Sequence, residues 1–175
     1  MTPSGRQLRL AAGDYIAMVT EVGATLREFT HRGFPVTRGN EEDVRMQLHR
    51  GGLLAPWPNR IGDGKYTFDG VEMQLPVNEV TRNTAIHGLI NWHAWTIESA
   101  SEDRATLSTR IWPQPGYEFT IDLSVMYVLD ASAGLTITLV ATNTGATAAP
   151  YGAGIHPYLV ASGASVDDYT MTVPA

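Results

Sequence analysis

Three short segments hold the side chains best suited to chemistry, and each lies in a stretch rich in proline or glycine. They are 56–61 (PWPNRI), 86–88 (IHG) and 151–158 (YGAGIHPY). His87 and His156 are candidates for proton transfer, because an imidazole has a pKa of ~6.5 and exchanges protons at neutral pH. The planar guanidinium of Arg60 could bind sugar hydroxyls, a carboxylate or a phosphate.

Each of these residues also has a purely structural interpretation. Pro157 favours an extended backbone at His156, whose ring could simply bond a neighbouring carbonyl at the end of a strand. Gly88 allows a ligand to approach the backbone beside His87, but it fits a packed turn equally well. Arg60 could form a salt bridge on a surface loop.

The remaining histidines carry weaker signals. We expect His93, between two tryptophans, to be a packing or surface residue, whereas His31 and His49 have no suggestive neighbours in the sequence. A metal site built from His87, His93 and His156 lacks a diagnostic spacing. We therefore expect neither a metal nor a cofactor.

Tryptophans and carboxylates give no sharper assignment. The four tryptophans could offer flat faces to a sugar ring, although we expect most of them in the core; they are Trp57, Trp92, Trp95 and Trp112. No pairing pattern selects two carboxylates for glycoside hydrolysis; the candidates are Asp63, Glu79, Glu118, Asp167 and Asp168.

Length and composition limit the class of protein. The chain has 175 residues and a formal net charge of −6, which argues against nucleic-acid and anionic-membrane partners because both require a dense basic field. Cysteine is absent, so disulfides, thiolate metal sites and cysteine nucleophiles are excluded. No stretch approaches the ~20 apolar residues of a membrane span. We expect a soluble, cytoplasmic protein with one domain or part of one.

The elements that position these residues are predicted to be strands. Apolar residues alternate over 117–129 and again over 135–139, which predicts two neighbouring antiparallel strands. Asp69-Gly70 predicts a tight hairpin within 65–75. Shorter β-type segments are 15–19, 24–29, 94–98, 105–111 and 169–173. The long stretch 45–64 has little periodicity, and such loops are often functional. The pattern indicates an all-β sandwich or barrel.

Taken in order, the segments resemble the aldose 1-epimerase (galactose mutarotase) family. Residues 58–70 are similar to the family's N-R-I, G-x-[FY] and [DN]-G run, and Asn78 with 86–88 is similar to its N…L-H-G element. Trp95 occupies the place of a family tryptophan. Residues 156–159 resemble the H-x-Y-F-N-L segment, with Leu159-Val160 in place of Phe-Asn, and 168–175 are similar to the strand that follows.

The resemblance implies an all-β fold, a large antiparallel β-sandwich, of which residues 1–175 would form the N-terminal portion and which would be incomplete at its C-terminus. It implies an isomerase that interconverts the α and β anomers of a free hexose. His156 and His87 would be the catalytic residues, with His156 protonating the ring oxygen. Arg60, Asn59, His87 and Tyr158 would bind the sugar.

The resemblance places the general-base glutamate beyond the matched region, so this chain would be inactive alone. A non-catalytic carbohydrate-binding or regulatory protein therefore stays open as an alternative. An enzyme acting on a phosphorylated hexose is a third possibility, against which the lack of a basic cluster near Arg60 counts in the sequence.

Overall fold

The computed structural model describes residues 2–161 and 165–174, and its regular structure is almost entirely antiparallel β. A first sheet has the order β1-β2-β3-β4, with strands that follow one another along the chain. Its strands are β1 (Gln7–Ala12), β2 (Tyr15–Thr20), β3 (Leu26–His31) and β4 (Phe34–Thr37). A meander of this kind needs only short connections between neighbours.

The second sheet has the order β10-β11-β12-β13 and contains the longest strands. Its strands are β10 (Thr96–Ala100), β11 (Arg104–Ile111), β12 (Ile121–Asp130) and β13 (Gly134–Asn143). Burial alternates along β12, so that one face lies in the core and the other faces outward. This is the burial expected from alternating apolar residues.

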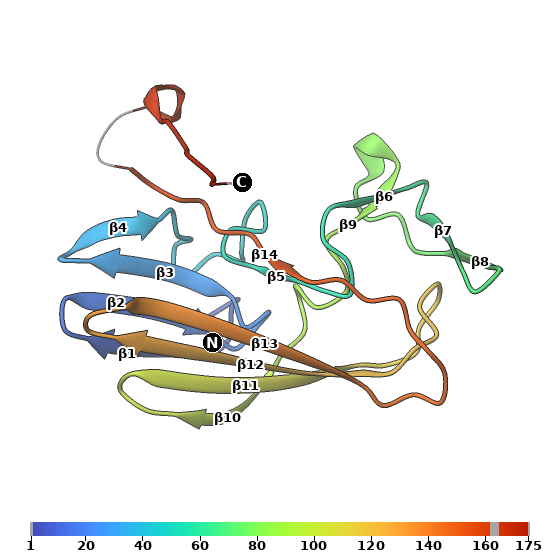
Figure 1. Ribbon diagram of the computed structural model, residues 1–175, viewed down its shortest axis with the longest axis horizontal. Helices are drawn as coiled ribbons and strands as arrows, with labels where there is room; N and C mark the ends of the chain where they lie inside the picture. Colours follow the sequence, from blue (N-terminus) through green and yellow to red (C-terminus); the bar gives the residue numbers. More distant parts are fainter. Residues whose placement is uncertain (1, 162–164, 175) are drawn as a thin grey trace.

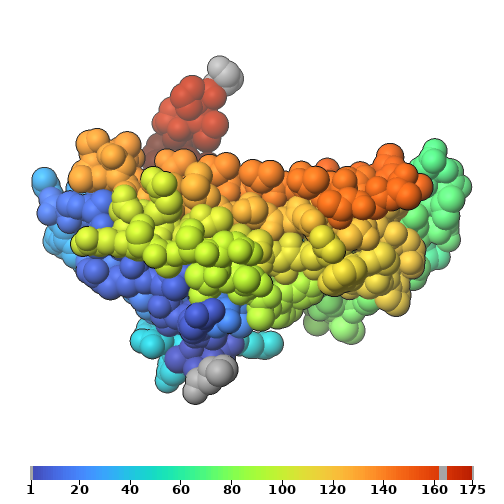
Figure 2. Space-filling view, turned by 90° about the horizontal axis from the view of Figure 1, so that it is seen from below, coloured from blue at the N-terminus to red at the C-terminus, as the bar shows by residue number. Residues whose placement is uncertain are grey.

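The two sheets pack face to face, and the first two strands lie against the middle of the second sheet (Figure 1). The buried hydroxyl of Tyr127 on β12 donates to the carbonyl oxygen of Ala24 at 2.5 Å and ties the layers together. Seen from below, β13 runs along one long side of the molecule and the N-terminal strands lie on the other (Figure 2). The predicted β-sandwich is confirmed.

Three two-stranded pairs stand beside the two sheets (Figure 1). They join β5 (Leu53–Leu54) to β14 (Gly154–Ile155), β6 (Arg60–Gly62) to β9 (Thr84–Ile86), and β7 (Lys65–Phe68) to β8 (Val71–Gln74). Asp69 and Gly70 both adopt positive φ between β7 and β8, which confirms the predicted hairpin.

Two predicted strands differ from the structure. β12 begins at Ile121 rather than at position 117, because Gln114 and Tyr117 close a tight turn that leaves 118–120 outside the ladder. Tyr117 and Phe119 are nevertheless buried. The predicted strand at 169–173 is absent, since this segment pairs with no described strand and its Met171 is 80% exposed.

Among the described residues, the helical content consists of two short 3₁₀ turns, Val80–Arg82 and Val166–Asp168. No helix in the described ranges has the length and hydropathy needed to cross a bilayer.

Gly51 sets the position of the loop that enters β5. Its φ is +70°, and a Cβ placed on it would lie 1.9 Å from the carbonyl oxygen of Leu26. The same residue accepts a hydrogen bond from the Leu26 amide and donates one to the carbonyl of His156. A glycine here therefore connects the first sheet to the segment that carries His156.

We expect Gly51→Ala to lower the free energy of unfolding by about 2–5 kcal/mol, the sum of a left-handed backbone penalty and overpacking. Gly33→Ala is the matched control, because Gly33 has a φ of +76° and nothing within 4 Å of its added Cβ. Urea unfolding of both variants measures the difference. Equal destabilisation of the two would contradict the close contact at Gly51.

Candidate active site

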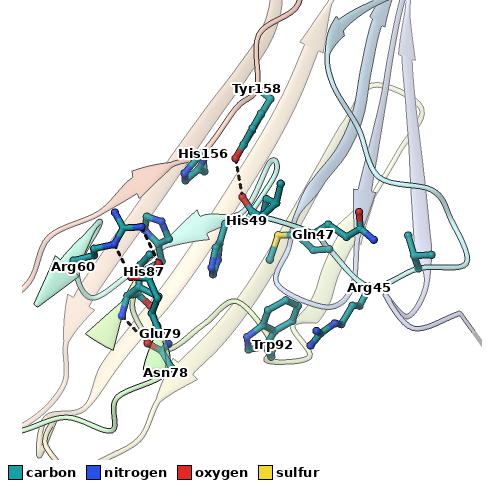
Figure 3. Close-up of a pocket in the computed structure, with 14 residues that line it drawn as sticks. Arg45, Gln47, His49, Arg60, Asn78, Glu79, His87, Trp92, His156 and Tyr158 are labelled. Carbon is teal, nitrogen blue, oxygen red and sulfur yellow. Dashed lines mark hydrogen bonds and ion pairs between the residues drawn. The ribbon is translucent and has the colours of Figure 1, made fainter. Parts of the chain in front are cut away.

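A cleft of about 970 Å³ lies beside the β5–β14 and β6–β9 pairs, and all three segments singled out in the sequence contribute to it (Figure 3). Its walls are the loop 44–49, the end of β9, Trp92 and the segment after β14. Of the predicted residues, those that line the cleft are Arg60, His87, His156 and Tyr158. Side chains separated by up to about a hundred residues in sequence thus face one space.

Arg60 and Glu79 form a two-pronged ion pair on one wall. The Arg60 Nε and Nη2 atoms donate to the two carboxylate oxygens of Glu79 at 2.6 and 2.9 Å, and the Thr84 hydroxyl donates to the same carboxylate at 2.8 Å. The bond from Arg60, and to a smaller extent the bond from Thr84, lowers the pKa of Glu79 to about 2. Glu79 therefore stays ionised and holds Arg60 in one orientation, but it is a weak proton acceptor.

His87 is fixed by reciprocal bonds with Asn59. The Asn59 amide donates to His87 Nδ1 at 3.1 Å, and the His87 amide donates to the Asn59 carbonyl at 2.9 Å. Because Nδ1 accepts a proton donor, the neutral ring must carry its own proton on Nε2. Burial, followed by the neighbouring His49 and His156, lowers the pKa of His87 to about 4. At neutral pH His87 is thus an uncharged hydrogen-bond donor.

His156 is positioned through its backbone. Its amide donates to the Gly52 carbonyl at 3.0 Å, and its carbonyl accepts from the Gly51 amide at 2.9 Å, directly after the β5–β14 pair. Its ring lies edge-on to His87 at 5.1 Å and stacks on Tyr158 at 5.3 Å between centroids. No described residue bonds its ring nitrogens, which leaves them available for a ligand in the cleft.

Tyr158 and Asn59 lie near the cleft in supporting positions. The Tyr158 hydroxyl donates to the Leu48 carbonyl at 3.3 Å, and the guanidinium of Arg50 lies over its ring at 5.6 Å. Tyr158 therefore joins the loop 44–49 to the wall that carries His156. Asn59 is not among the lining residues; its backbone orients His87, and its Oδ1 accepts from Arg60 at 3.2 Å.

The cleft is also lined by residues that the sequence analysis did not assign to the site, among them Arg45, His49, Glu79 and Trp92. His49 has no suggestive neighbours in the sequence, but its ring lies 4.6 Å from that of His87 between centroids. The one signal for it was its place in the aperiodic stretch 45–64. Within residues 2–161 and 165–174, no group of three or more ligating side chains is arranged as a metal site.

The comparisons with known proteins identify the family. The sequence profile of the aldose 1-epimerase family matches residues 6–175. The chain belongs to the aldose 1-epimerase family. The uncharacterized protein YihR of Escherichia coli is 42% identical over 98% of this chain and 56% of its own length.

Solved structures show the same epimerase fold. An aldose epimerase homologue from C. elegans superimposes with a TM-score of 0.80 at 20% identity, covering 91% of this chain and 52% of that one. A galactose mutarotase-like protein from Clostridium acetobutylicum gives a TM-score of 0.72 at 26% identity, covering 85% and 49%. The chain thus spans about half the length of these epimerase relatives.

The lowered pKa of His87 makes stability depend on pH. Between pH 6.5 and about 4 the unfolded chain protonates this histidine while the folded protein does not, so the free energy of unfolding falls as the pH falls through this window. His87→Asn removes the titrating ring, keeps an oxygen acceptor for the Asn59 amide and suits the φ of +62°.

We therefore expect the melting temperature to fall less between pH 7 and pH 4.5 in His87→Asn than in the unmodified protein. Thermal unfolding followed by circular dichroism at a series of pH values measures this. Parallel curves for the two proteins would show that His87 does not resist protonation in the folded state.

Proposed function

We propose that the full-length protein is an aldose 1-epimerase that interconverts the α and β anomers of a free hexose. The observation that carries this proposal is the meeting of Arg60, His87 and His156 in one cleft, in a chain of the aldose 1-epimerase family. The proposed substrate is a monosaccharide whose ring opens and closes again, and no cofactor is required.

Ring opening needs one proton delivered to the ring oxygen and one removed from the anomeric hydroxyl. We assign the delivery to His156, because its ring nitrogens are unoccupied by described residues and an imidazole can donate at neutral pH. His87 would donate a hydrogen bond through Nε2, and Arg60 would bind a hydroxyl or ring oxygen beside it. When the ring closes on the opposite face of the aldehyde, the other anomer forms. The two proton transfers are then reversed, so both groups regain their starting protonation states.

The removal of the hydroxyl proton needs a second group. Glu79 is the carboxylate among the described lining residues, and its ion pair with Arg60 makes it a poor base. We therefore propose that the base is supplied by a part of the protein outside these 175 residues, in the portion of the fold that the longer relatives possess. The 175-residue chain alone is expected to be inactive.

Polarimetry with α-D-galactose and α-D-glucose tests the proposal on the full-length protein. Loss of the general acid in His156→Ala should lower the rate of anomer equilibration about 10²- to 10⁴-fold. His93→Ala is the matched control, since His93 does not line the cleft, and should leave the rate unchanged. A full-length protein that does not accelerate equilibration, or a His156→Ala variant as fast as the unmodified protein, would overturn the assignment.

The ion pair that makes Glu79 a poor base favours one alternative, a carbohydrate-binding or regulatory protein of the same fold. Such a protein would need the donors of the cleft but no base. Binding of a hexose by the full-length protein without turnover would establish it, and anomer exchange would exclude it.

Arg45 favours a second alternative, an epimerase that acts on a phosphorylated hexose. Its guanidinium lies in the cleft 5.5 Å from the centroid of the Trp92 ring and pairs with no described carboxylate, whereas Arg60 is occupied by Glu79. The sequence argument that the site has no second cation therefore does not hold.

If this alternative is correct, inorganic phosphate should inhibit the full-length enzyme, and Arg45→Gln should weaken that inhibition about 10- to 150-fold, as expected for one charged hydrogen bond. Absence of inhibition would leave a neutral hexose as the substrate.

A further inference from the structure

His49 stands at the centre of the cleft without a role in the proposed reaction. Its ring lies 4.6 Å from His87 and 6.5 Å from His156 between centroids, and it faces Trp92 on the other side (Figure 3). The backbone φ of His49 is +57°, in the left-handed region, which residues with a side chain adopt infrequently. The fold thus places this imidazole beside the other two.

A buried asparagine determines where the proton of His49 lies. The amide nitrogen of Asn91, which is 4% exposed, donates to the His87 carbonyl at 2.7 Å. The Asn91 oxygen therefore faces His49 Nδ1, 3.3 Å away. An amide oxygen only accepts, so the neutral His49 carries its proton on Nδ1 and has a lone pair on Nε2.

The Nε2 atom of His49 is open to the cleft. It bonds no described residue. It is also absent from the buried side-chain atoms of the described residues that lack a hydrogen-bond partner, so it is exposed to solvent in the cleft. Burial of the ring lowers the pKa of His49, and the charge of a protonated His156 would lower it further. The ring is uncharged at neutral pH, so its lone pair is free to accept a hydrogen bond.

His49 and His87 therefore present opposite hydrogen-bonding character side by side. His87 offers a proton on Nε2 because Asn59 occupies its Nδ1, whereas His49 offers a lone pair on Nε2 because Asn91 occupies its Nδ1. A sugar hydroxyl is both a donor and an acceptor, and neighbouring hydroxyls on a ring can satisfy both nitrogens at once.

We propose that His49 binds the sugar directly, accepting a hydrogen bond from a ring hydroxyl through Nε2, and with His87 selects hexoses by the arrangement of adjacent hydroxyls. This inference rests on the proposed binding of a hexose in the cleft. It makes His49 a specificity-determining residue. A purely structural histidine at this position would serve only to hold Asn91.

His49→Asn separates the two roles. The asparagine amide nitrogen replaces Nδ1 and can still donate to Asn91, and asparagine tolerates the left-handed backbone, but nothing replaces Nε2. We expect the Kd of the full-length protein for its hexose to rise about 3- to 10-fold, as for loss of one hydrogen bond, with KM rising similarly and kcat little changed. His49→Gln extends an amide to the position of Nε2 and should recover part of the affinity.

Calorimetric titration with D-galactose and D-glucose measures these constants, with His93→Asn as the matched control outside the cleft. Monodeoxyfluoro analogues identify the hydroxyl, since fluorine cannot donate a hydrogen bond. The analogue modified at that position should bind the unmodified protein more weakly and lose no further affinity in His49→Asn.

Two outcomes would overturn the inference and are distinguishable. If the unmodified protein binds a hexose and His49→Asn binds it equally well, or if every fluoro analogue is affected equally in both proteins, His49 serves only to hold Asn91. If the unmodified protein binds and converts neither sugar, the proposed function fails and this inference fails with it.

Discussion

The reciprocal hydrogen bonds between Asn59 and His87 are the interaction on which the site depends. They connect the residue before β6 to the residue after β9, and they do so with both backbones in the left-handed region, at φ values of +60° and +62°. One of the bonds also sets the proton of His87. Arg60 follows Asn59 directly, and Asn91, which bonds the carbonyl of His87, also faces His49 Nδ1, so this contact joins the backbone segments that carry the site residues.

The chemistry that results centres on two uncharged imidazoles, His87 and His49, one with a fixed donor and the other with a fixed acceptor. Burial is the main cause that disfavours the charged forms of His87 and His49. The pKa of His87 accordingly lies near 4. Oriented donors and acceptors of this kind are what the hydroxyls of the proposed hexose would need. The ion pair of Arg60 with Glu79 adds a fixed guanidinium, and in the proposed reaction it leaves proton removal to another group.

Local patterns predicted much of this architecture, and long-range contacts account for what they missed. Alternation located β12 and β13, and Asp69-Gly70 located the hairpin, because both depend on neighbours in sequence. The start of β12 and the absence of a strand at 169–173 depend on which backbone is available to pair. His87, His156 and Arg60 were found through their motifs. His49 was not, because the contact that orients its ring is with Asn91, 42 residues away in the sequence.

The central claim is that the cleft presents neutral imidazoles with opposite tautomers. Long-range ¹H–¹⁵N NMR of the histidine side chains at pH 7 tests it directly, since the nitrogen shifts distinguish a protonated from an unprotonated ring nitrogen. The account predicts a proton on Nε2 alone for His87 and on Nδ1 alone for His49. A doubly protonated ring at either position, or the same tautomer at both, would contradict it.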